Sequence, residues 1–408
     1  MATLAGYNGA FYASRRNCLQ FDAAGETLTV IDPAGGELDF AATDNFSIEL
    51  WVQVAAVGNG LLLDKYDATD LGYKVEVAAN VLVFTIGDGT FTPAITGGTA
   101  VNDGLWHHVL CVRDVSLDVL ALYLDGASDA VAVADTTTGT LATADNLVVG
   151  STDTGNLRRV GQVRVYNTDL TAAQAVDLAI GDIPDIQQYI VGSWACINGA
   201  GAVVLDDSGN RNNGAIVAAT WSTVTYDSAV AEVPTGLING VNKTYTLAHE
   251  NVDNANIAIT VDAALLVEGD YTLTPKGTIV CVTAPAATIV VDYRWYAMTL
   301  ECGEFHAWSL EWAADALDVT TFASGGPRTF LAGLTTWTAT AERYIIHGGH
   351  AHDLSHKLIC EFYHVESTAK YFDGWGIVTG VSPSVAVDTV ISETITFQGT
   401  GQLGIETS

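Results

Sequence analysis

Alternation of apolar and polar residues runs along most of the chain and predicts β-strands. The clearest stretch is 306–312, in which every second residue is large: His306, Trp308, Leu310 and Trp312. Because successive side chains of a strand point to opposite faces, this set shares one face, which we expect to be core, and Ser309 and Glu311 fall on the other. Turns such as Asp125-Gly126 separate the apolar runs. The pattern predicts an all-β protein.

Breaks in this pattern divide the chain into four segments: 1–14, 15–225, 226–294 and 295–408. The first is a short apolar stretch that needs a partner strand elsewhere. The second predicts one large β-sandwich with a helix at 171–180, anchored by Leu170 and Val176. The third is a β-module of about 60 residues, which is marginal in size for independent stability. The fourth ends in a strand in which three residues share a face: Ile391, Ile395 and Phe397.

Composition indicates a folded and acidic protein. Hydrophobic residues make up 49% of the chain and charged residues 15%, a balance that is not that of a disordered polymer. The formal net charge is −31. A basic surface, which nucleic-acid binding needs, is therefore not expected, although DNA can slide past an acidic surface without being trapped.

The six cysteines are far apart and lack Cys-x-x-Cys spacing. Because several lie in apolar runs, buried free thiols are favoured over disulfides, which suits assembly in a reducing cytoplasm. The N-terminus lacks the basic and then apolar pattern of a signal peptide, and no apolar run reaches ~18 residues. We expect neither signal-peptide export nor a membrane span.

Two polar loops contain candidate metal ligands. The first is rich in histidine: His347, His350, His352 and His356. Imidazoles at this spacing suit Zn²⁺ or Ni²⁺ if the loop folds back, and the alternative is a polar turn with exposed histidines. The second loop offers oxygen atoms: Asp206, Asp207, Asn210 and Asn212. These suit Ca²⁺, and the alternative is an Asx-type turn in which the side chains bond the backbone.

Six motifs in residues 15–225 resemble those of the laminin-G-like, concanavalin-A-like jelly roll. In chain order they are Phe46–Trp51, Leu105–Val109, Leu122–Gly126, Val165–Ala175, Trp194-Ala195 and Asp206–Gly214. Trp51 and Trp106 have the size to fill the layer between two sheets. The last motif usually opens such domains but closes this one, as in a permuted version. The resemblance implies the fold more than a site, and it favours calcium at the Asp206 loop.

Residues 295–408 resemble phage tail-tube proteins. The matching motifs are Trp308–Leu310 running into Asp318–Phe322, then Arg328, Phe330 and Gly333-Leu334 with Trp337, and the closing Thr396–Gly401. The His-rich turn 347–356 departs from the family. Residues 5–12 resemble the opening strand of the same family, which normally lies only a few residues before the Trp308 strand. We hypothesise that the jelly roll and the module are insertions in an early loop, so residues 5–12 should pair with the C-terminal sheet.

Together the two resemblances imply an all-β, tail-tube-type β-sandwich or barrel that carries an inserted concanavalin-A-like jelly roll and a small β-sandwich module. The expected function is that of a virion tail-tube subunit, assembled in the host cytoplasm, whose homo-hexameric rings stack into a DNA conduit. An acidic lumen would repel DNA phosphates. Expected partners are other copies, other phage tail proteins and host glycans at the outward-facing jelly roll. Expected contacts between rings are Asp318, Thr320, Phe322, Arg328 and Phe330.

Two other classes of function compete. One is a glycan-binding tail-fibre or baseplate-associated adhesin, in which the jelly roll does the work and the C-terminal segment anchors it. The other is an enzyme, because some jelly-roll relatives are glycoside hydrolases, which need two carboxylates across a cleft. No strand shows the closely alternating carboxylates of such a site, Glu49 stands alone as an expected outward residue, and His107 and His108 are expected to be framework. We expect no catalytic site.

Overall fold

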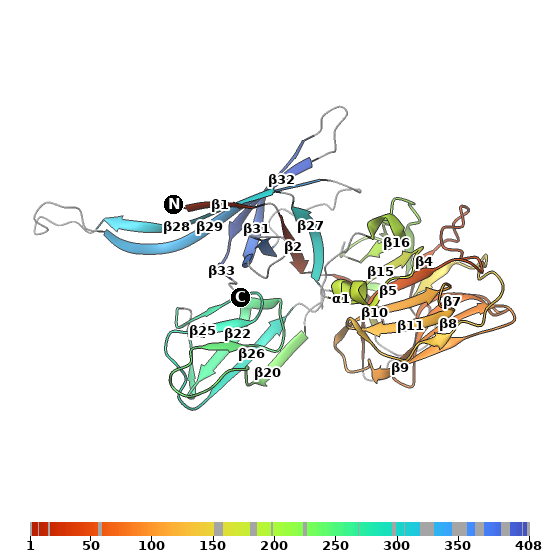
Figure 1. Ribbon diagram of the computed structural model, residues 1–408, viewed down its shortest axis with the longest axis horizontal. Helices are drawn as coiled ribbons and strands as arrows, with labels where there is room; N and C mark the ends of the chain where they lie inside the picture. Colours follow the sequence, from red (N-terminus) through yellow and green to blue (C-terminus); the bar gives the residue numbers. More distant parts are fainter. Residues whose placement is uncertain are drawn as a thin grey trace, which may run out of the picture. The chain divides into compact units, whose positions relative to one another are not determined.

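The computed structural model describes residues 2–6, 8–14, 17–55, 59–150, 158–179, 186–196, 199–222, 227–267, 269–295, 299–305, 307–318, 330–344, 357–363, 371–384, 392–401 and 403–405. The chain divides into two compact units (Figure 1). Unit 1 combines Met1–Ser14 with Ser228–Ser408, and unit 2 is Arg15–Asp227. Strands dominate both units, as the alternation predicts. Among the described residues, no helix is long and apolar enough to cross a membrane.

Unit 2 is a sandwich of two antiparallel sheets. The first, which we call the β5 sheet, contains β3 (Cys18–Phe21), β5 (Phe46–Val54), β10 (Trp106–Asp114), β11 (Val119–Leu124), β12 (Ala127–Ser128), β13 (Val133–Ala134), β15 (Arg158–Tyr166), β16 (Ile190–Ala195) and β19 (Thr220–Ser222). Its strand order is β12-β11-β10-β5-β15-β3-β19, with β13 beside β11 and β16 beside β15.

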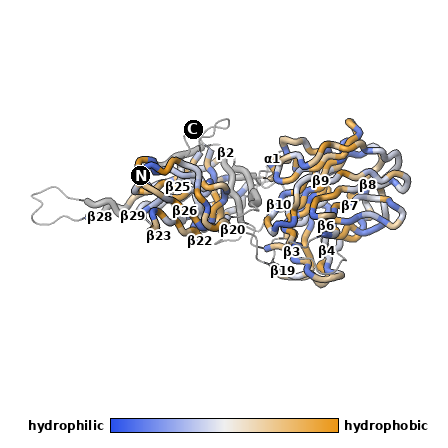
Figure 2. Tube along the Cα trace, turned by 90° about the horizontal axis from the view of Figure 1, so that it is seen from below, coloured by the Kyte–Doolittle hydropathy of each residue, from blue (hydrophilic) through white to orange (hydrophobic). Residues whose placement is uncertain are grey.

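The second sheet of unit 2, the β7 sheet, contains β4 (Thr27–Val30), β6 (Gly60–Tyr66), β7 (Leu71–Ala78), β8 (Val81–Asp88), β9 (Ala94–Ala100), β14 (Leu147–Val149), β17 (Val203–Val204) and β18 (Gly214–Val217). Its strand order is β17-β18-β4-β14-β6-β7-β8-β9. Figure 2 shows the apolar residues along these strands, interrupted by polar turns.

Alternate residues of each sheet fill the layer between them. Ile48, Leu50 and Val52 of β5 face Tyr73 and Val75 of β7 across this core. The tryptophan of this core is Trp194 on β16, which is fully buried. The expectation that Trp51 and Trp106 fill the same layer is wrong, because the strand register places both on the outer face of the β5 sheet. Trp51 is at an odd position of β5, whereas the core positions of that strand are even, and Trp106 of β10 stands opposite Gln53, which is on the same face as Trp51.

One short helix, α1 (Ala172–Ala179), covers part of that outer face, followed by the turn η1 (Gln187–Tyr189). Thr171 and Gln174 form a reciprocal cap at its start: the Gln174 amide donates to Thr171 Oγ1 at 3.3 Å, and the Thr171 amide donates to Gln174 Oε1 at 2.8 Å. Leu170 is buried as expected. Val176 is 49% exposed, so the expectation that it anchors the helix is wrong; Leu178 takes that place.

The two ends of unit 2 lie side by side. β3 and β19 are antiparallel neighbours, with Cys18 opposite Ser222, and Cys18 Sγ lies 3.6 Å from the Ser222 carbonyl oxygen. An insertion requires this arrangement, because the host chain must leave and return at nearly one point. Five described cysteines are buried thiols outside any disulfide, which confirms the expectation for them: Cys18, Cys111, Cys196, Cys281 and Cys360.

Unit 1 contains a large sheet, the β29 sheet, to which both ends of the chain contribute. Its strands are β1 (Ala2–Gly6), β2 (Asn8–Ser14), β27 (Thr299–Phe305), β28 (Ala307–Asp318), β29 (Phe330–Tyr344), β30 (Lys357–Tyr363), β31 (Tyr371–Ser384), β32 (Ser392–Gly399) and β33 (Gly404–Ile405). The order is β1-β28-β29-β32-β31-β30-β2-β27, with β33 beside β31. β1 pairs with β28, with Gly6 opposite Trp308, and β2 lies between β30 and β27. The pairing required of residues 5–12 is therefore present.

The core of the β29 sheet follows the predicted face only in part. Trp308 and Leu310 are buried together with Trp337, whereas Trp312 is 39% exposed. The expectation that Trp312 shares this core is wrong. The pairing of β1 with β28 ends at Trp312, and β28 continues beyond that point, past the packed region. Ile395 and Phe397 of β32 are buried on one face, as expected, and Ile391 lies outside the described residues.

The small module of unit 1 is a sandwich of two sheets. The β22 sheet contains β20 (Asp227–Glu232), β22 (Val252–Val261), β23 (Ala264–Leu265) and β26 (Ile289–Trp295), in the order β20-β26-β22-β23. The β25 sheet contains β21 (Thr244–Thr246), β24 (Tyr271–Leu273) and β25 (Thr278–Cys281), in the order β21-β25-β24. Its core continues into the β29 sheet through Ile359 and Trp375. Shared packing thus compensates for the small size of the module.

Candidate functional site

The outer face of the β7 sheet presents polar side chains on three adjacent strands. The side chains named here come from β6, β7 and β8, and we call this set the β7 outer face: Asp64, Tyr66, Lys74, Glu76 and Thr85. Asp64 stands opposite Lys74, and Lys74 stands opposite Thr85, so a polar row crosses the sheet. The residues on either side of each point into the sandwich core. Asp64, Tyr66, Lys74 and Glu76 are half-buried on this outer face, and Thr85 is buried.

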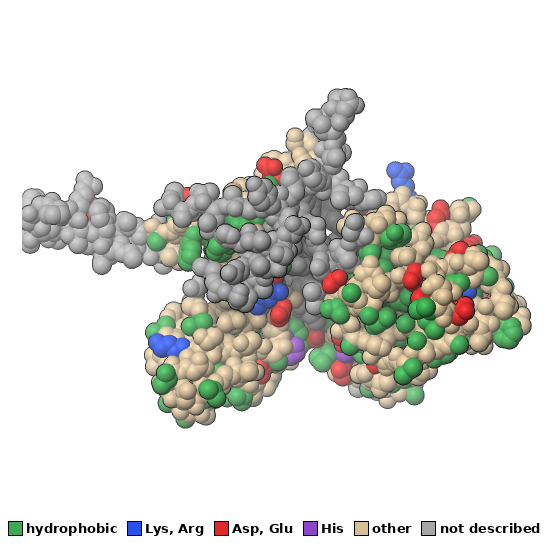
Figure 3. All heavy atoms as spheres, in the orientation of Figure 1, with side chains coloured by type: hydrophobic (Ala, Val, Ile, Leu, Met, Phe, Trp, Pro, Cys, Tyr) green, Lys and Arg blue, Asp and Glu red, His purple; other side chains and the backbone are tan. Residues whose placement is uncertain are grey.

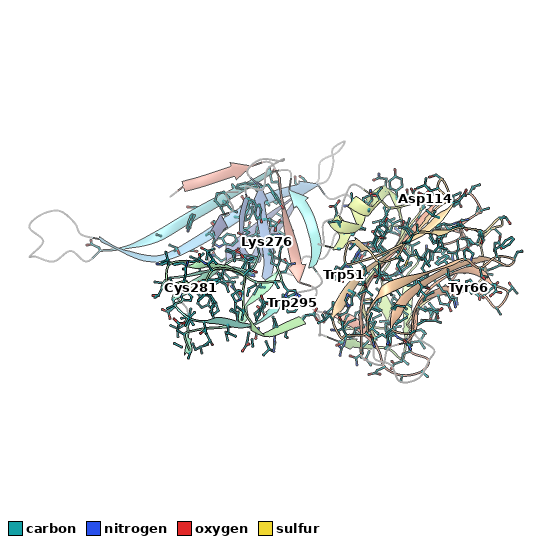
Figure 4. All side chains as sticks on the ribbon, turned by 60° about the horizontal axis from the view of Figure 1, so that its bottom comes forward. Trp51, Tyr66, Asp114, Lys276, Cys281 and Trp295 are labelled. Carbon is teal, nitrogen blue, oxygen red and sulfur yellow. The ribbon has the colours of Figure 1, made fainter. Side chains whose placement is uncertain are left out.

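The Tyr66 ring lies against this face of the sheet over two glycines, Gly72 and Gly87. It stands opposite Gly72 in the register, and a Cβ at Gly87 would lie 2.9 Å from Tyr66 Oη and 2.1 Å from the Asp70 carbonyl oxygen. A larger residue at Gly87 would therefore lift the ring off the sheet. The Tyr66 hydroxyl donates to Asp70 Oδ1 at 3.2 Å. Figure 4 shows Tyr66 at the periphery of unit 2.

Charged groups surround this ring. Lys74 Nζ lies 5.5 Å from the ring centroid of Tyr66 and 3.1 Å from Glu76 Oε1. Burial and the neighbouring Asp70 carboxylate raise the pKa of Tyr66 to about 12, so its hydroxyl remains a hydrogen-bond donor at neutral pH. Burial also raises the pKa of Asp64, against the opposing effect of the Lys74 ammonium. The face offers one aromatic surface, one ammonium and several carboxylate acceptors.

Well-bonded turns hold the rim of this face. Asp67 accepts hydrogen bonds from the Thr69 amide at 2.7 Å and the Leu71 amide at 3.0 Å. Asp88 bridges two loops, because Oδ1 accepts the Phe91 amide at 2.7 Å and Oδ2 accepts the Thr138 amide at 2.7 Å. Burial opposes ionisation of Asp88, but these backbone donors outweigh it and hold its pKa below the usual range. The Phe91 side chain is 44% exposed at this rim.

A second polar group lies on the outer face of the β5 sheet and is buried. Glu49 accepts hydrogen bonds from Arg164 Nη1 at 3.1 Å and the Tyr166 hydroxyl at 2.5 Å, and His108 Nε2 lies 3.7 Å from it. Burial alone would raise the pKa of Glu49, but Arg164 and the other partners lower it to about 2. Glu49 lies on the outer face of the sheet, as expected, but it is not exposed to solvent, because only 1% of its surface is accessible. Trp51 packs beside His108 at 5.3 Å between ring centroids.

His107 lies at the start of β10 between two carboxylates. Its Nδ1 is 2.8 Å from Asp125 Oδ2, and its Nε2 is 3.2 Å from Asp103 Oδ1. Burial opposes protonation, but the two carboxylates outweigh it and raise the pKa of His107. The Trp106 amide donates to Asp227 Oδ2 at 3.3 Å nearby. These contacts fix the start of β10 and its turn, so the expected framework role fits the geometry.

The Asp206 loop is organised by backbone hydrogen bonds. Asp206 Oδ1 accepts the Ser193 and Ser208 amides at 3.0 Å each, and Oδ2 accepts the Asn212 amide at 2.9 Å. The Asn210 side chain donates to the Val191 carbonyl oxygen at 2.9 Å. Asp207 lies next in the chain, and its amide donates to the Ser193 carbonyl oxygen at 2.8 Å. The geometry is that of the Asx-type alternative, and calcium at this loop stays a prediction.

The other sequence-predicted site residues fall mostly outside the described residues. This holds for the whole histidine set, His347, His350, His352 and His356, and for Thr320, Phe322 and Arg328. Asp318 is exposed at the end of β28 and pairs with Phe330 of β29. Within the described ranges, no group of three or more His, Cys, Asp or Glu side chains has a metal-binding arrangement. Metal binding and the contacts between rings stay predictions.

The β7 outer face was not predicted from the sequence. Its alternating pattern is visible there, because Asp64 and Tyr66 alternate with core residues on one strand, as Lys74 and Glu76 do on the next. What was missing was the register that brings the two strands together. That register depends on the turn at Asp67–Asp70 and on an irregularity between Leu61 and Leu63, which a sequence pattern does not reveal.

Comparisons with known proteins agree with this fold. Residues 30–175 match the family model of the concanavalin A-like lectin/glucanases superfamily. Unit 2 therefore contains a lectin-like jelly roll of this class, as its motifs predict. The matched range does not extend to residues 1–14 or 295–408, so their tail-tube resemblance stays a prediction. No curated protein matches the chain.

Similar solved structures are distant. A Bacteroides ovatus protein described as carbohydrate-binding is 14% identical with a TM-score of 0.42, over 52% of this chain and 60% of its own. The binding domain of Paraclostridial mosquitocidal protein 1 is 10% identical with a TM-score of 0.36, over 98% and 87%. The binding domain of botulinum neurotoxin serotype G is 11% identical with a TM-score of 0.36, over 96% and 88%.

Proposed function

We propose that the chain is a glycan-binding adhesin of a phage tail fibre or baseplate, in which unit 2 binds the glycan and unit 1 anchors it. The observation that carries the glycan-binding part is the match of residues 30–175 to a lectin/glucanase family model. The phage context rests on the resemblance of residues 1–14 and 295–408 to tail proteins. The protein would then belong to the virion, and its partners would be host glycans and other tail proteins.

The β7 outer face is the proposed binding surface. The apolar faces of sugar rings stack on aromatic side chains, and sugar hydroxyls donate to carboxylates and accept from ammonium groups. Tyr66 supplies the aromatic surface, Asp64 and Glu76 the acceptors, and Lys74 the donor. Phe91 at the rim offers a second apolar contact for a longer chain of sugars.

The charge distribution of unit 2 favours neutral glycans over sialylated or sulfated ones. Several of its basic side chains are buried and engaged internally: Lys65, Arg113, Arg158 and Arg164. Carboxylates at Asp67, Asp70 and Glu76 stay near the surface. On the side of unit 2 drawn in Figure 3, acidic side chains are more prominent than basic ones. An anionic sugar would meet repulsion there.

Binding without hydrolysis is part of the proposal. A glycoside hydrolase needs one carboxyl group that is protonated near neutral pH as general acid. Glu49, on the outer face of the β5 sheet, has its pKa lowered to about 2 by its partners, Arg164 foremost, against the opposing effect of burial. It is therefore ionised and held in an ion pair, which suits a structural role.

Glycan binding of the full chain tests the proposal. We expect neutral glycans to bind on an array and Tyr66→Ala to weaken that binding about tenfold, because the stacking surface is lost. The matched control is Tyr189→Ala, which removes a tyrosine that is 40% exposed in η1. If no glycan binds, the function is wrong. If anionic glycans bind best, the ligand class is wrong, and if both variants lose binding equally, the surface is wrong.

The second candidate is the tail-tube subunit, and a specific observation favours it. Strands β1 and β2 complete a sheet made otherwise of residues 299–405, as the tube resemblance requires. In addition, β28 and β29 pair as far as Asp318 and Phe330, beyond the partner of β1 at Trp312. Such a projecting ribbon suits contact with another subunit. In this candidate, rings of the chain stack into a conduit through which DNA passes without specific binding.

Electron microscopy of the purified full chain separates the two candidates. The tube predicts hexameric rings or stacked rings and a high copy number in the virion. The adhesin predicts monomers or trimers and a low copy number. Rings that bind no glycan would favour the tube over the adhesin.

A further inference from the structure

Lys65 is buried in unit 2 in surroundings that are unusual for a lysine. Its side chain has no exposed surface. It extends from β6 opposite Tyr73, on the core side of the β7 sheet. Four oxygen atoms lie close to Nζ: Asp32 Oδ1 at 2.8 Å, Asp39 Oδ1 at 3.0 Å, the Thr143 carbonyl at 2.7 Å and the Asp145 carbonyl at 3.0 Å. We call these four atoms the Lys65 cage.

The cage has more acceptors than a lysine can use. An ammonium group has three N–H donors, whereas four oxygens lie at hydrogen-bonding distance around Nζ. Two of them carry charge, so the ammonium leaves a net charge of about −1 in the cage at neutral pH. Two carboxylates and two carbonyls, all oxygen, form the type of ligand set that Ca²⁺ takes, completed by water.

Two loops depend on this contact. Asp32 and Asp39 lie in the loop that follows β4, and Thr143 and Asp145 lie in the loop that precedes β14. Contacts between the loops support the cage, because the Thr143 amide donates to Asp39 Oδ1 at 3.3 Å and the Asp32 amide donates to Asn146 Oδ1 at 3.0 Å. The ligand atoms are thus positioned by both loops as well as by the lysine.

We infer that the Lys65 cage is a divalent-cation site whose occupant is the tethered ammonium of Lys65, and that truncating this side chain opens the site to Ca²⁺. The inference is independent of glycan binding. In the natural chain the Lys65 ammonium occupies the position of a bound ion and holds the two loops together at this point without metal. In Lys65→Ala, the two carboxylates lose their only cation within the cage, and Ca²⁺ restores the charge balance.

The thermal midpoint of the full chain against Ca²⁺ concentration tests this inference. We expect Lys65→Ala to unfold at a lower temperature than the natural chain in EDTA. Its midpoint should then rise steadily as Ca²⁺ increases from about 10 μM to about 10 mM, as for a ligand that binds the folded state. Adding Asp39→Asn to this variant should shift the rise to higher Ca²⁺, because one charged ligand is lost.

Lys65→Met is the matched control. Its side chain is one atom shorter than that of lysine and places an uncharged methyl group where lysine has Cε, next to the cage. Lys65→Met should therefore be destabilised without being rescued by Ca²⁺. Calcium bound elsewhere, for example at the Asp206 loop, would raise the thermal midpoint of the natural chain, Lys65→Met and Lys65→Ala alike. If the midpoint of Lys65→Ala rises no more than the other two, the inference is overturned. If Lys65→Ala does not fold, its refolding is followed by circular dichroism. Refolding only with Ca²⁺ supports the inference, and no refolding with Ca²⁺ overturns it.

Discussion

Individual buried charges of unit 2 have defined partners, and one carboxylate at its boundary is only weakly compensated. Glu49 and Arg164 form a buried ion pair, and Arg113 donates to Asp135 at 2.7 Å. Asp227 is 6% exposed, and the hydrogen bond from the Trp106 amide is 3.3 Å long. Burial raises the pKa of Asp227 to about 6, in spite of this bond and of His107 nearby. Charge at this position therefore opposes folding at neutral pH.

Replacement of this carboxylate should stabilise the protein in a pH-dependent way. Because the folded-state pKa lies above the ordinary value of 3.8, the neutral acid is favoured on folding. That contribution is complete below pH 3.8 and is lost as the pH rises through about 6. Asp227→Asn still accepts from the Trp106 amide, and we expect it to raise the free energy of unfolding by about 1 kcal/mol at pH 7.5. Urea denaturation at pH 7.5 and pH 3.5 measures the difference, and an equal gain at both pH values would contradict it.

At the scale of elements, the sequence predicted which residues share a face better than which face is covered. The expected outward face of Glu49 is correct, but Trp51, which shares that face, was expected in the core between the sheets. Trp51 lies outside the sandwich and is nevertheless buried, because burial there depends on what covers the sheet and not on the alternation. The β7 outer face was missed for a related reason. Its residues come together only through strand register, and register is a property of pairs of strands.

The contact between the small module and the β29 sheet is the element-scale feature with the clearest energetic consequence. Trp375 of β31 is 2% exposed, and its Nε1 donates to the Val252 carbonyl oxygen at 3.1 Å. Lys276 Nζ of the module lies 3.0 Å from Glu361 Oε1 of β30 and 3.0 Å from Glu250 Oε2. Figure 4 labels Lys276. Burial opposes the charge of Lys276, but these two carboxylates outweigh it and raise its pKa. The module and the sheet should therefore unfold together.

Removal of the Trp375 side chain tests this coupling. We expect Trp375→Ala to lower the free energy of unfolding of unit 1 by about 3–5 kcal/mol, because a large buried side chain and its hydrogen bond are lost from a shared core. Trp312→Ala is the control, since that side chain is 39% exposed, and its effect should be about 1 kcal/mol or less. Denaturation followed by tryptophan fluorescence measures both. Comparable losses in the two variants would show that Trp375 does not join the module to the sheet.

For the whole molecule, the two units should fold independently although one interrupts the other in the sequence. Unit 2 begins and ends on neighbouring strands, with Cys18 of β3 opposite Ser222 of β19, and its core lies between its own sheets. Unit 1 joins β1 and β2 to strands near the C-terminus, so its sheet needs residues 1–14 but not residues 15–227. A chain that leaves and returns at adjacent points adds little loop-closure entropy to its host.

Excision of unit 2 makes this independence measurable. We expect residues 15–227 alone to give a cooperative unfolding transition. We also expect a chain in which a Gly/Ser linker of about eight residues joins Ser14 to Ser228 to keep the β29 sheet. Deletion of residues 1–14 from that linked chain is the control and should destabilise it strongly, because β28 and β30 each lose a paired neighbour. Hydrogen exchange should then show loss of protection in both strands. If the linked chain fails to fold while residues 1–14 can be removed from the full chain without effect, unit 2 is not an insertion into unit 1.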